Sequence, residues 1–240
     1  MRLHDFRVLT FDCYGTLIDW ETGLYAALAP LLHAARVALA PDAVLAEFAR
    51  HEAEQEHATP AMRYSELLAQ VHRRLARQWD VKLTGAEHAA FGRSVPNWPA
   101  FPDTAAALGY LKRHYKLVIL SNVDRAGFAG SQEQLGVGFD AVCTAEDIGS
   151  YKPDAGNFRY LIDTVAKLGC AADCILHTAQ SLYHDHVPAQ AAGLRSAWID
   201  RRQAREGWGA TLPPQGTARY DFRFPSLAAL VSAHQAEESR

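Results

Sequence analysis

Short apolar runs recur along the chain and are separated by segments of helical periodicity. Five of the runs are predicted to be buried strands because they are rich in β-branched or other apolar residues: Val8–Phe11, Leu117–Leu120, Ala141–Thr144, Ile175–Thr178 and Ser196–Ile199. Helical patterns lie between the later runs: Ala105–His114, Ala155–Leu168 and Pro188–Ala192. A strand candidate over Asp221–Phe224 and a helix from Ser226 close the chain. This alternation predicts an α/β fold with a parallel sheet covered on both faces.

The segment between the first two predicted strands is too long for a single crossover. It holds about 100 residues, whereas a crossover in a parallel sheet takes roughly a dozen or slightly more. Inside it, apolar residues repeat at helix spacing: Leu24, Leu28, Leu31 and Leu32, then Val44, Leu45 and Phe48, then Leu67, Leu68, Val71 and Leu75. We therefore predict a Rossmann-like core of residues 1–19 and 100–240, with a helical cap of residues 20–99 inserted after the first strand.

Composition and charge narrow the functional classes. With 49% hydrophobic and 21% charged residues, the 240-residue chain has the composition of an ordinary globular protein. A net charge of −3 offers no basic surface for nucleic acid or an anionic membrane. No apolar stretch approaches the roughly 20 residues that span a bilayer. The N-terminus runs into the first strand without an apolar signal region, so a cytoplasmic enzyme is expected.

Polar residues follow the first two predicted strands. Asp12 comes directly after Val8–Phe11, and the turn Gly15-Thr16 follows it. Ser121 and Asn122 come after the second strand. Ligands of open parallel sheets bind outside the carboxyl ends of the strands, so these side chains are candidates for chemistry. For Ser121 and Asn122, a purely structural turn is the alternative.

Two later segments add candidate residues. Lys152, within Gly149–Asp154, comes shortly before a predicted helix and is a candidate for chemistry, although a solvated helix start is the alternative. The segment His177–Asp185 follows the fourth strand and offers Gln180, Ser181 and Asp185. The histidines in and beside it, His177, His184 and His186, are not expected to bind a metal, and His184 and His186, on either side of Asp185, are interpreted as turn residues.

The segment Leu9–Asp19 resembles motif I of the haloacid dehalogenase-like (HAD) hydrolases, in which the first aspartate is a covalent nucleophile. Ser121, Lys152 and Asp185 are similar to residues of motifs II, III and IV. Phosphatases of that superfamily carry further acids where this chain has Tyr14 and Gln180. The resemblance is therefore to the 2-haloacid dehalogenase branch, and it implies an active site without metal or other cofactor.

The resemblance also implies roles for individual residues. Catalytic roles fall on Asp12, Lys152 and Asp185, and substrate-binding roles on Tyr14, Thr16, Arg50, Trp98, Ser121, Asn122, Gln180 and Ser181. Arg50 matches the cap arginine that receives halide and pairs with the substrate carboxylate, with a surface-helix arginine as the alternative. Trp98 would line the pocket, or pack in the hinge between cap and core.

The implied reaction is hydrolysis of a carbon–halogen bond. Asp12 would attack the α-carbon of a small 2-substituted carboxylic acid, and water would hydrolyse the resulting ester near Asp185, as in (S)-2-haloacid dehalogenases. Several segments, Leu9–Gly23, Asn97–Thr104, Gly149–Pro153 and Ile175–Ala189, resemble an azetidine-2-carboxylate hydrolase of the same branch, which opens a four-membered ring. A magnesium-dependent phosphatase is a further alternative. Related dehalogenases are commonly dimers, so a homodimer is expected.

Overall fold

The computed structural model describes residues 1–36, 38–203, 206–214 and 216–238. Its strands are β1 (Val8–Phe11), β2 (Lys116–Ser121), β3 (Ala141–Thr144), β4 (Ile175–Ala179), β5 (Arg195–Ile199) and β6 (Phe222–Phe224). They form one parallel sheet in the order β3-β2-β1-β4-β5-β6. The predicted α/β fold is confirmed, and each predicted strand matches an observed one within two residues at either end.

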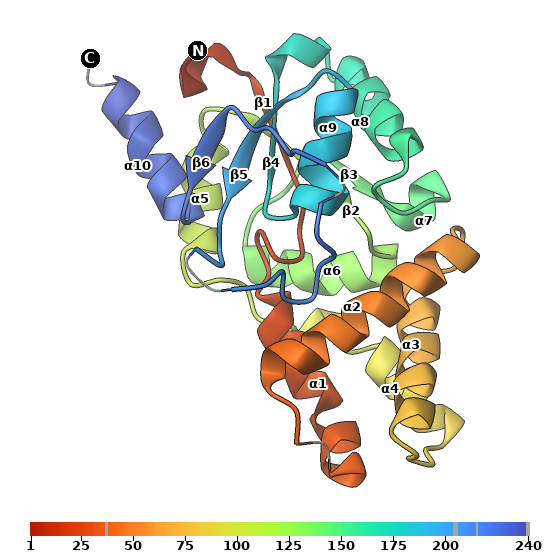
Figure 1. Cartoon of the computed structure of the whole chain (residues 1–240). Coiled ribbons are helices and arrows are strands. Elements are labelled where there is room, and N and C mark those ends of the chain that lie inside the picture. Colours follow the sequence, from red (N-terminus) through yellow and green to blue (C-terminus); the bar gives the residue numbers. More distant parts are fainter. Residues whose placement is uncertain (37, 204–205, 215, 239–240) are drawn as a thin grey trace.

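Helices cover both faces of the sheet (Figure 1). Their bounds are α1 (Trp20–Ala35), α2 (Pro41–Ala58), α3 (Tyr64–Gln78), α4 (Gly85–Gly92), α5 (Thr104–Leu111), α6 (Arg125–Leu135), α7 (Ala145–Ile148), α8 (Ala155–Lys167), α9 (Val187–Ala191) and α10 (Leu227–Glu238). Leu9 and Leu117 share one apolar cluster with side chains of α5, α6 and α10. Val8 and Val118 belong to a second cluster with α8 and α9. Neighbouring strand residues thus point to opposite faces, and both faces are buried.

The helices α1 to α4 gather beside the carboxyl ends of the strands (Figure 1). They belong to the segment of residues 20–99, which we call the helical insertion. Asp19, directly before this segment, accepts a hydrogen bond from the Thr22 amide at 3.3 Å and so caps α1. At the other end of the segment, Trp98 is buried against Gly23 of α1. The division into a core and a cap domain stays a prediction.

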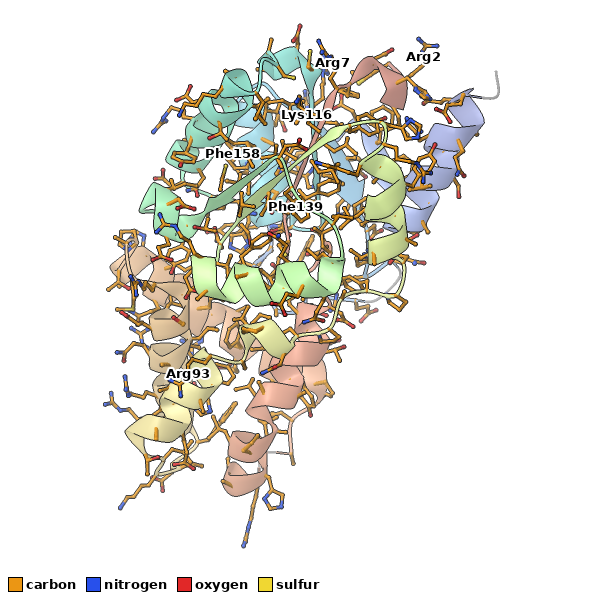
Figure 2. The ribbon with its side chains drawn as sticks, turned by 180° about the vertical axis from the view of Figure 1, so that it is seen from behind. Arg2, Arg7, Arg93, Lys116, Phe139 and Phe158 are labelled. Carbon is orange, nitrogen blue, oxygen red and sulfur yellow. The ribbon has the colours of Figure 1, made fainter. Side chains whose placement is uncertain are left out.

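Polar contacts join the insertion to the rest of the chain. The Asp124 carboxylate, at the start of α6, accepts a hydrogen bond from the Ser65 amide at 2.8 Å. The Tyr151 hydroxyl donates to the Met62 carbonyl at 2.5 Å. In the view from behind, Arg93 lies on the insertion and Lys116 at the far end of the sheet (Figure 2). The insertion is therefore anchored at the edge where the predicted site residues end their strands.

The predicted helical patterns leave out α4, which lies inside the insertion. They also leave out two helices outside the insertion, α6 and the short α7. Both follow strands at the carboxyl edge, and Asp124 caps α6 by accepting from the Gly127 amide at 2.8 Å. Their mixed polar and small residues give a weaker periodic signal than α8. Among the described residues, no helix is both long enough and apolar enough to cross a membrane.

Candidate active site

Asp12 lies at the tip of β1, where the chain leaves the centre of the sheet. The strand is buried along its whole length, and the residue Asp12 is itself only 6% exposed. Gly15 then turns the chain with a φ of +94°, a conformation that side-chain-bearing residues rarely adopt. This turn brings the Thr16 hydroxyl back to donate to Asp12 Oδ2 at 2.7 Å. The turn therefore fixes the carboxylate that the strand delivers.

Lys152 connects Asp12 with a second carboxylate. Its Nζ lies 2.9 Å from Asp12 Oδ1 and 2.7 Å from Asp185 Oδ1, and it donates to the Leu120 carbonyl at 3.1 Å. The lysine is 1% exposed. Burial lowers its pKa, but the two carboxylates outweigh that effect and raise the pKa above the ordinary lysine value. Lys152 is therefore a permanent cation in this site.

The two carboxylates differ because their partners differ. Burial opposes ionisation of Asp185, but the Lys152 ammonium and the His177 hydrogen bond hold the pKa of Asp185 below its usual range. His177 Nε2 lies 2.9 Å from Asp185 Oδ1, and its Nδ1 lies 2.8 Å from the Thr10 hydroxyl. For Asp12, burial raises the pKa above the ordinary value against the lowering effect of Lys152. Asp185 thus carries the more firmly held charge of the pair.

Asp185 sits on a single π-helical turn, Leu182–His186, after β4. Such turns are rare and frequent at functional sites. Ser181 caps the turn, its hydroxyl accepting from the His184 amide at 3.0 Å. The second oxygen of Asp185, Oδ2, is buried and has no hydrogen-bond partner among the described residues. It is therefore free to accept a hydrogen bond from a ligand or water.

The tip of β2 holds the lysine in place and contributes a free hydroxyl. Asn122 Oδ1 accepts from the Lys152 amide at 2.7 Å, and Asn122 Nδ2 donates to the Lys152 carbonyl at 3.0 Å. Ser121 Oγ is buried without a hydrogen-bond partner in the described part of the chain. Asn122 therefore positions the cation, while Ser121 offers an unused donor and acceptor.

These groups surround a cavity of about 40 Å³ between the sheet edge and the insertion. Its lining residues are Asp12, Tyr14, Trp20, Glu52, Glu56, Tyr64, Ser121, Asn122, Lys152, Ser181, His184, Asp185 and Thr211. A larger cavity of about 450 Å³ shares Glu56 and Lys152 with it, so the two adjoin. The predicted residues Asp12, Tyr14, Ser121, Asn122, Lys152, Ser181 and Asp185 all meet at the smaller cavity.

Four predicted substrate-binding residues do not line this cavity: Arg50, Trp98, Gln180 and Thr16. Arg50 lies on the exposed side of α2, its side chain 48% exposed and paired with Glu47 at 3.1 Å and Glu54 at 2.8 Å. Trp98 packs edge-on against the Tyr14 ring, with centroids 5.7 Å apart. The backbone N–H of Gln180 donates to Thr16 Oγ1 at 2.9 Å, and Gln180 lines a different pocket. Arg50 thus lies on the surface of its helix, which was the alternative to a halide-binding role. Trp98 packs against other side chains, which was the alternative to lining the pocket.

Tyr14 and Thr16 have positions of a different kind. The Tyr14 hydroxyl bonds to Ser131 Oγ of α6 at 2.9 Å, so its ring walls the cavity while the polar end is engaged elsewhere. The Thr16 hydroxyl lies between Asp12 and the Gln180 amide and supports the carboxylate from behind.

The insertion contributes two buried acids that the sequence analysis did not single out, Glu52 and Glu56 of α2. Glu52 Oε1 accepts from the Tyr64 hydroxyl at 2.6 Å, and Glu56 Oε1 accepts from Asn122 Nδ2 at 3.2 Å. Burial raises the pKa of Glu52 to about 8 and that of Glu56 well above its ordinary value. The sequence did indicate that Glu52 and Glu56 lie on the buried face of the helix, because they continue the apolar row of Val44 and Phe48 at four-residue steps.

The histidines near the site form hydrogen bonds rather than a metal cluster. His186 Nδ1 pairs with Ser196 Oγ at 2.9 Å, and its Nε2 with the Ala179 carbonyl at 2.9 Å. In the described ranges, a metal-like grouping of three or more His, Cys, Asp or Glu side chains occurs only at His4, His234 and Glu238. That group lies at the chain ends, away from the strand tips.

The fold and the site together define an α/β protein with a carboxylate–lysine centre at the carboxyl edge of a parallel sheet. Residues 6–175 match the family model of haloacid dehalogenase-like hydrolases, and the chain belongs to this family. It is therefore a hydrolase by family. A comparison with curated proteins gives no match.

Solved structures similar to this chain share its fold at low identity. A defluorinating L-2-haloacid dehalogenase is 20% identical with a TM-score of 0.76, over 96% of this chain and 95% of that one. The L-2-haloacid dehalogenase of Xanthobacter autotrophicus, with chloropropionic acid covalently bound, is 16% identical with a TM-score of 0.75, over 96% and 98%. A Bacillus subtilis protein named as a HAD hydrolase and bound to magnesium is 19% identical with a TM-score of 0.75, over 98% and 100%. At these identities the likeness shows the fold alone, so this chain's own side chains must decide the reaction.

Proposed function

We propose that this protein hydrolyses a bond between a saturated carbon and its leaving group in a small 2-substituted carboxylic acid, with Asp12 as the nucleophile. The observation that carries the proposal is the Asp12 carboxylate itself. It is buried at a cavity wall and held on one oxygen by Lys152 and on the other by Thr16. A carboxylate so fixed is oriented for attack and has lost most of its hydration, which makes it a better nucleophile.

The reaction has two steps. Asp12 attacks the carbon in line with the leaving group and becomes an alkyl ester, which neutralises its charge. Water then attacks the carbonyl carbon of that ester, with Asp185 as the group that orients the water or accepts its proton. Lys152 contacts both carboxylates, so it stabilises the ionised Asp12 before attack and the negative charge that develops on it during hydrolysis. Ser121 Oγ is the donor available to the substrate carboxylate.

The side chains present do not fit a magnesium site well. Magnesium takes six oxygen ligands at near-octahedral positions, usually with carboxylates among them. Tyr14 supplies a ring to the cavity, and Gln180 lines another pocket. Asp185 Oδ1 already meets both Lys152 and His177. We therefore propose a reaction that needs no metal.

Two leaving groups fit this mechanism. The neighbours named as L-2-haloacid dehalogenases favour a halide. The second candidate is the nitrogen of a strained ring, as in azetidine-2-carboxylate. One observation favours it: Glu52 and Glu56 lie at the cavity where a halide-binding arginine was expected, while Arg50 is turned to the surface. We also propose that residues 20–99 act as a cap that closes over the substrate.

The test is turnover of two substrates by the purified protein. Halide release from 2-chloropropionate and ring opening of azetidine-2-carboxylate are each measured with EDTA and with added magnesium, beside Asp12→Asn. We expect turnover of one of them that ignores EDTA and is lost in the variant. Magnesium-dependent hydrolysis of phosphate esters, with neither carboxylic acid turned over, would contradict the proposal and support the phosphatase alternative.

A further inference from the structure

The wall of the cavity supplied by the insertion is acidic. The lining carries four carboxyl groups, from Asp12, Asp185, Glu52 and Glu56, and a single ammonium group, that of Lys152. Lys152 already bonds to both aspartates. The cavity therefore has no cation to spare for the two glutamates, and an anionic substrate alone would meet two aspartates balanced by one lysine.

The glutamates are not explained by packing. Burying a carboxyl group costs free energy unless it gains strong partners, and glutamine would fit the same space without an ionisable group. Each glutamate accepts one neutral donor among the described residues, Tyr64 for Glu52 and Asn122 for Glu56. His184 lies 3.9 Å from Glu56, but burial lowers the pKa of this histidine to about 4, so it brings no charge at neutral pH. Buried acids with raised pKa values at a cavity are typical of functional sites.

Two further atoms at the same cavity lack partners. Ser121 Oγ and Asp185 Oδ2 are buried, and neither has a hydrogen-bond partner in the described ranges. Both belong to residues that line the cavity opposite the insertion. The cavity thus offers a hydroxyl donor beside Lys152 and an acidic wall facing it, the pattern that matches the two ends of a zwitterion.

We propose that Glu52 and Glu56 bind a protonated amine, and that the substrate is a small cyclic amino acid whose ring nitrogen is the leaving group displaced by Asp12. This inference rests on the proposed function and specifies its substrate class. The carboxylate of such a substrate accepts from Ser121, while its ammonium group lies between the two glutamates. One of them then carries the counter-charge and the other keeps its proton.

The proton balance follows from this arrangement. An Asp12 oxygen bonds to carbon, the carbon–nitrogen bond breaks, and its electron pair stays on nitrogen, which leaves as a neutral amine. The protonated glutamate gives its proton to that amine, which becomes an ammonium group again. Water then adds to the carbonyl carbon of the ester, the alkoxide takes one proton of that water, and Asp12 is released as the acid. Loss of the Asp12 proton reprotonates the glutamate, so the net reaction is substrate plus water to a hydroxy-substituted ammonium acid.

Binding without turnover tests the inference apart from the chemistry. Calorimetry on Asp12→Asn compares azetidine-2-carboxylate with oxetane-2-carboxylate, which has the same ring size and an uncharged oxygen. We expect the amine to bind about tenfold tighter or more, and Glu52→Gln or Glu56→Gln to remove most of that preference. Titrations in buffers of different ionisation enthalpy should show proton release when the amine binds, lost in the glutamine variant that removes the counter-charge and kept in the other.

Glu54→Gln is the matched control, because Glu54 lies on the same helix with a half-exposed side chain. It should keep the affinity and the preference, and thermal melts check that every variant is folded. Equal binding of the two ring compounds, no binding of the amine, or unchanged preference in both glutamine variants would overturn the inference. The proposed function fails separately, by the absence of an Asp12 ester in the unmodified protein.

Discussion

At the scale of single residues, the site depends on one ammonium group shared by two carboxylates. Lys152 Nζ lies within hydrogen-bond distance of both Asp12 and Asp185. His177 adds a further donor to Asp185 only. The difference in partners separates the two pKa values, which is how a pair of like groups takes different roles.

The first prediction concerns the pH dependence of catalysis. Asp12 attacks only when ionised, and burial raises its pKa above 3.8 against the effect of Lys152. The specificity constant kcat/KM should therefore fall as the pH drops through the pKa of Asp12, which lies above the pKa of an ordinary aspartate. Lys152→Met removes the cation that lowers this pKa, so the acid limb should move to higher pH and kcat should drop by about 100-fold or more. An acid limb that stays in place would show that Lys152 does not set the charge of Asp12.

The second prediction links Glu52 to the stability of the fold. Its pKa is about 8 in the folded chain and near 4.5 when exposed, so the folded state holds the proton more tightly. The stabilisation of the folded state by this bound proton is complete below pH 4.5 and is lost as the pH rises towards 8. Urea unfolding at several pH values should therefore show Glu52→Gln losing less stability over this window than the unmodified chain. Parallel curves would contradict a raised pKa at Glu52.

The sequence could predict which residues at the strand tips belong to the site. It could not predict which residues of the insertion do. Asp12 and Ser121 follow apolar runs directly, so the end of each strand fixes where they lie. A helix residue depends instead on how the helix is rotated against its neighbours. Arg50 and Glu52 are two positions apart in α2 and face opposite environments, one exposed and one buried. A short local match at Arg50 carried no information on that rotation.

At the scale of elements, close helix contacts shape the insertion. Gly92 ends α4, and a Cβ added there would lie 2.1 Å from the Ser65 carbonyl oxygen of α3. Backbone atoms cannot move aside as a flexible side chain can. Glycine is thus required by the approach of the two helices.

The third prediction follows from this contact. Gly92→Ala should lower the free energy of unfolding by about 1–3 kcal/mol, the usual cost of overpacking. Gly109→Ala in α5 is the matched control, because an added Cβ meets no atom within 4 Å there. That change should leave stability equal or raise it by up to about 1 kcal/mol, since alanine favours helices. Thermal or urea unfolding of both variants checks the pair, and equal losses would refute the steric explanation.

At the scale of the whole molecule, the sequence predicted the existence of the sheet and of the inserted helices better than their arrangement. Each strand is a local pattern, but the order β3-β2-β1-β4-β5-β6 arises from which apolar faces pack together across the chain. The same limit applies to the cavity. Its acidic wall forms only because α2 lies across the strand tips (Figure 1).

The fourth prediction tests the anchoring of the insertion. The Tyr151 hydroxyl donates to the Met62 carbonyl, close to Lys152 in sequence. Tyr151→Phe removes that bond and should cost about 1 kcal/mol of stability. If closure of the insertion accompanies binding, KM should rise more than kcat falls, and amide hydrogen exchange should increase around Met62. Unchanged exchange and kinetics would show that this contact does not hold the insertion.

The most direct test of the central claim is where the oxygen of the solvent goes. The protein is allowed to turn over azetidine-2-carboxylate or 2-chloropropionate repeatedly in heavy-oxygen water, and the peptide containing Asp12 is then analysed by mass spectrometry. An ester on Asp12, hydrolysed at its carbonyl carbon, predicts that the heavy oxygen accumulates in the Asp12 carboxylate and reaches the product only after the first turnover. Label in the product from the first turnover, with an unlabelled Asp12 peptide, would show that water attacks the substrate directly and would contradict the account.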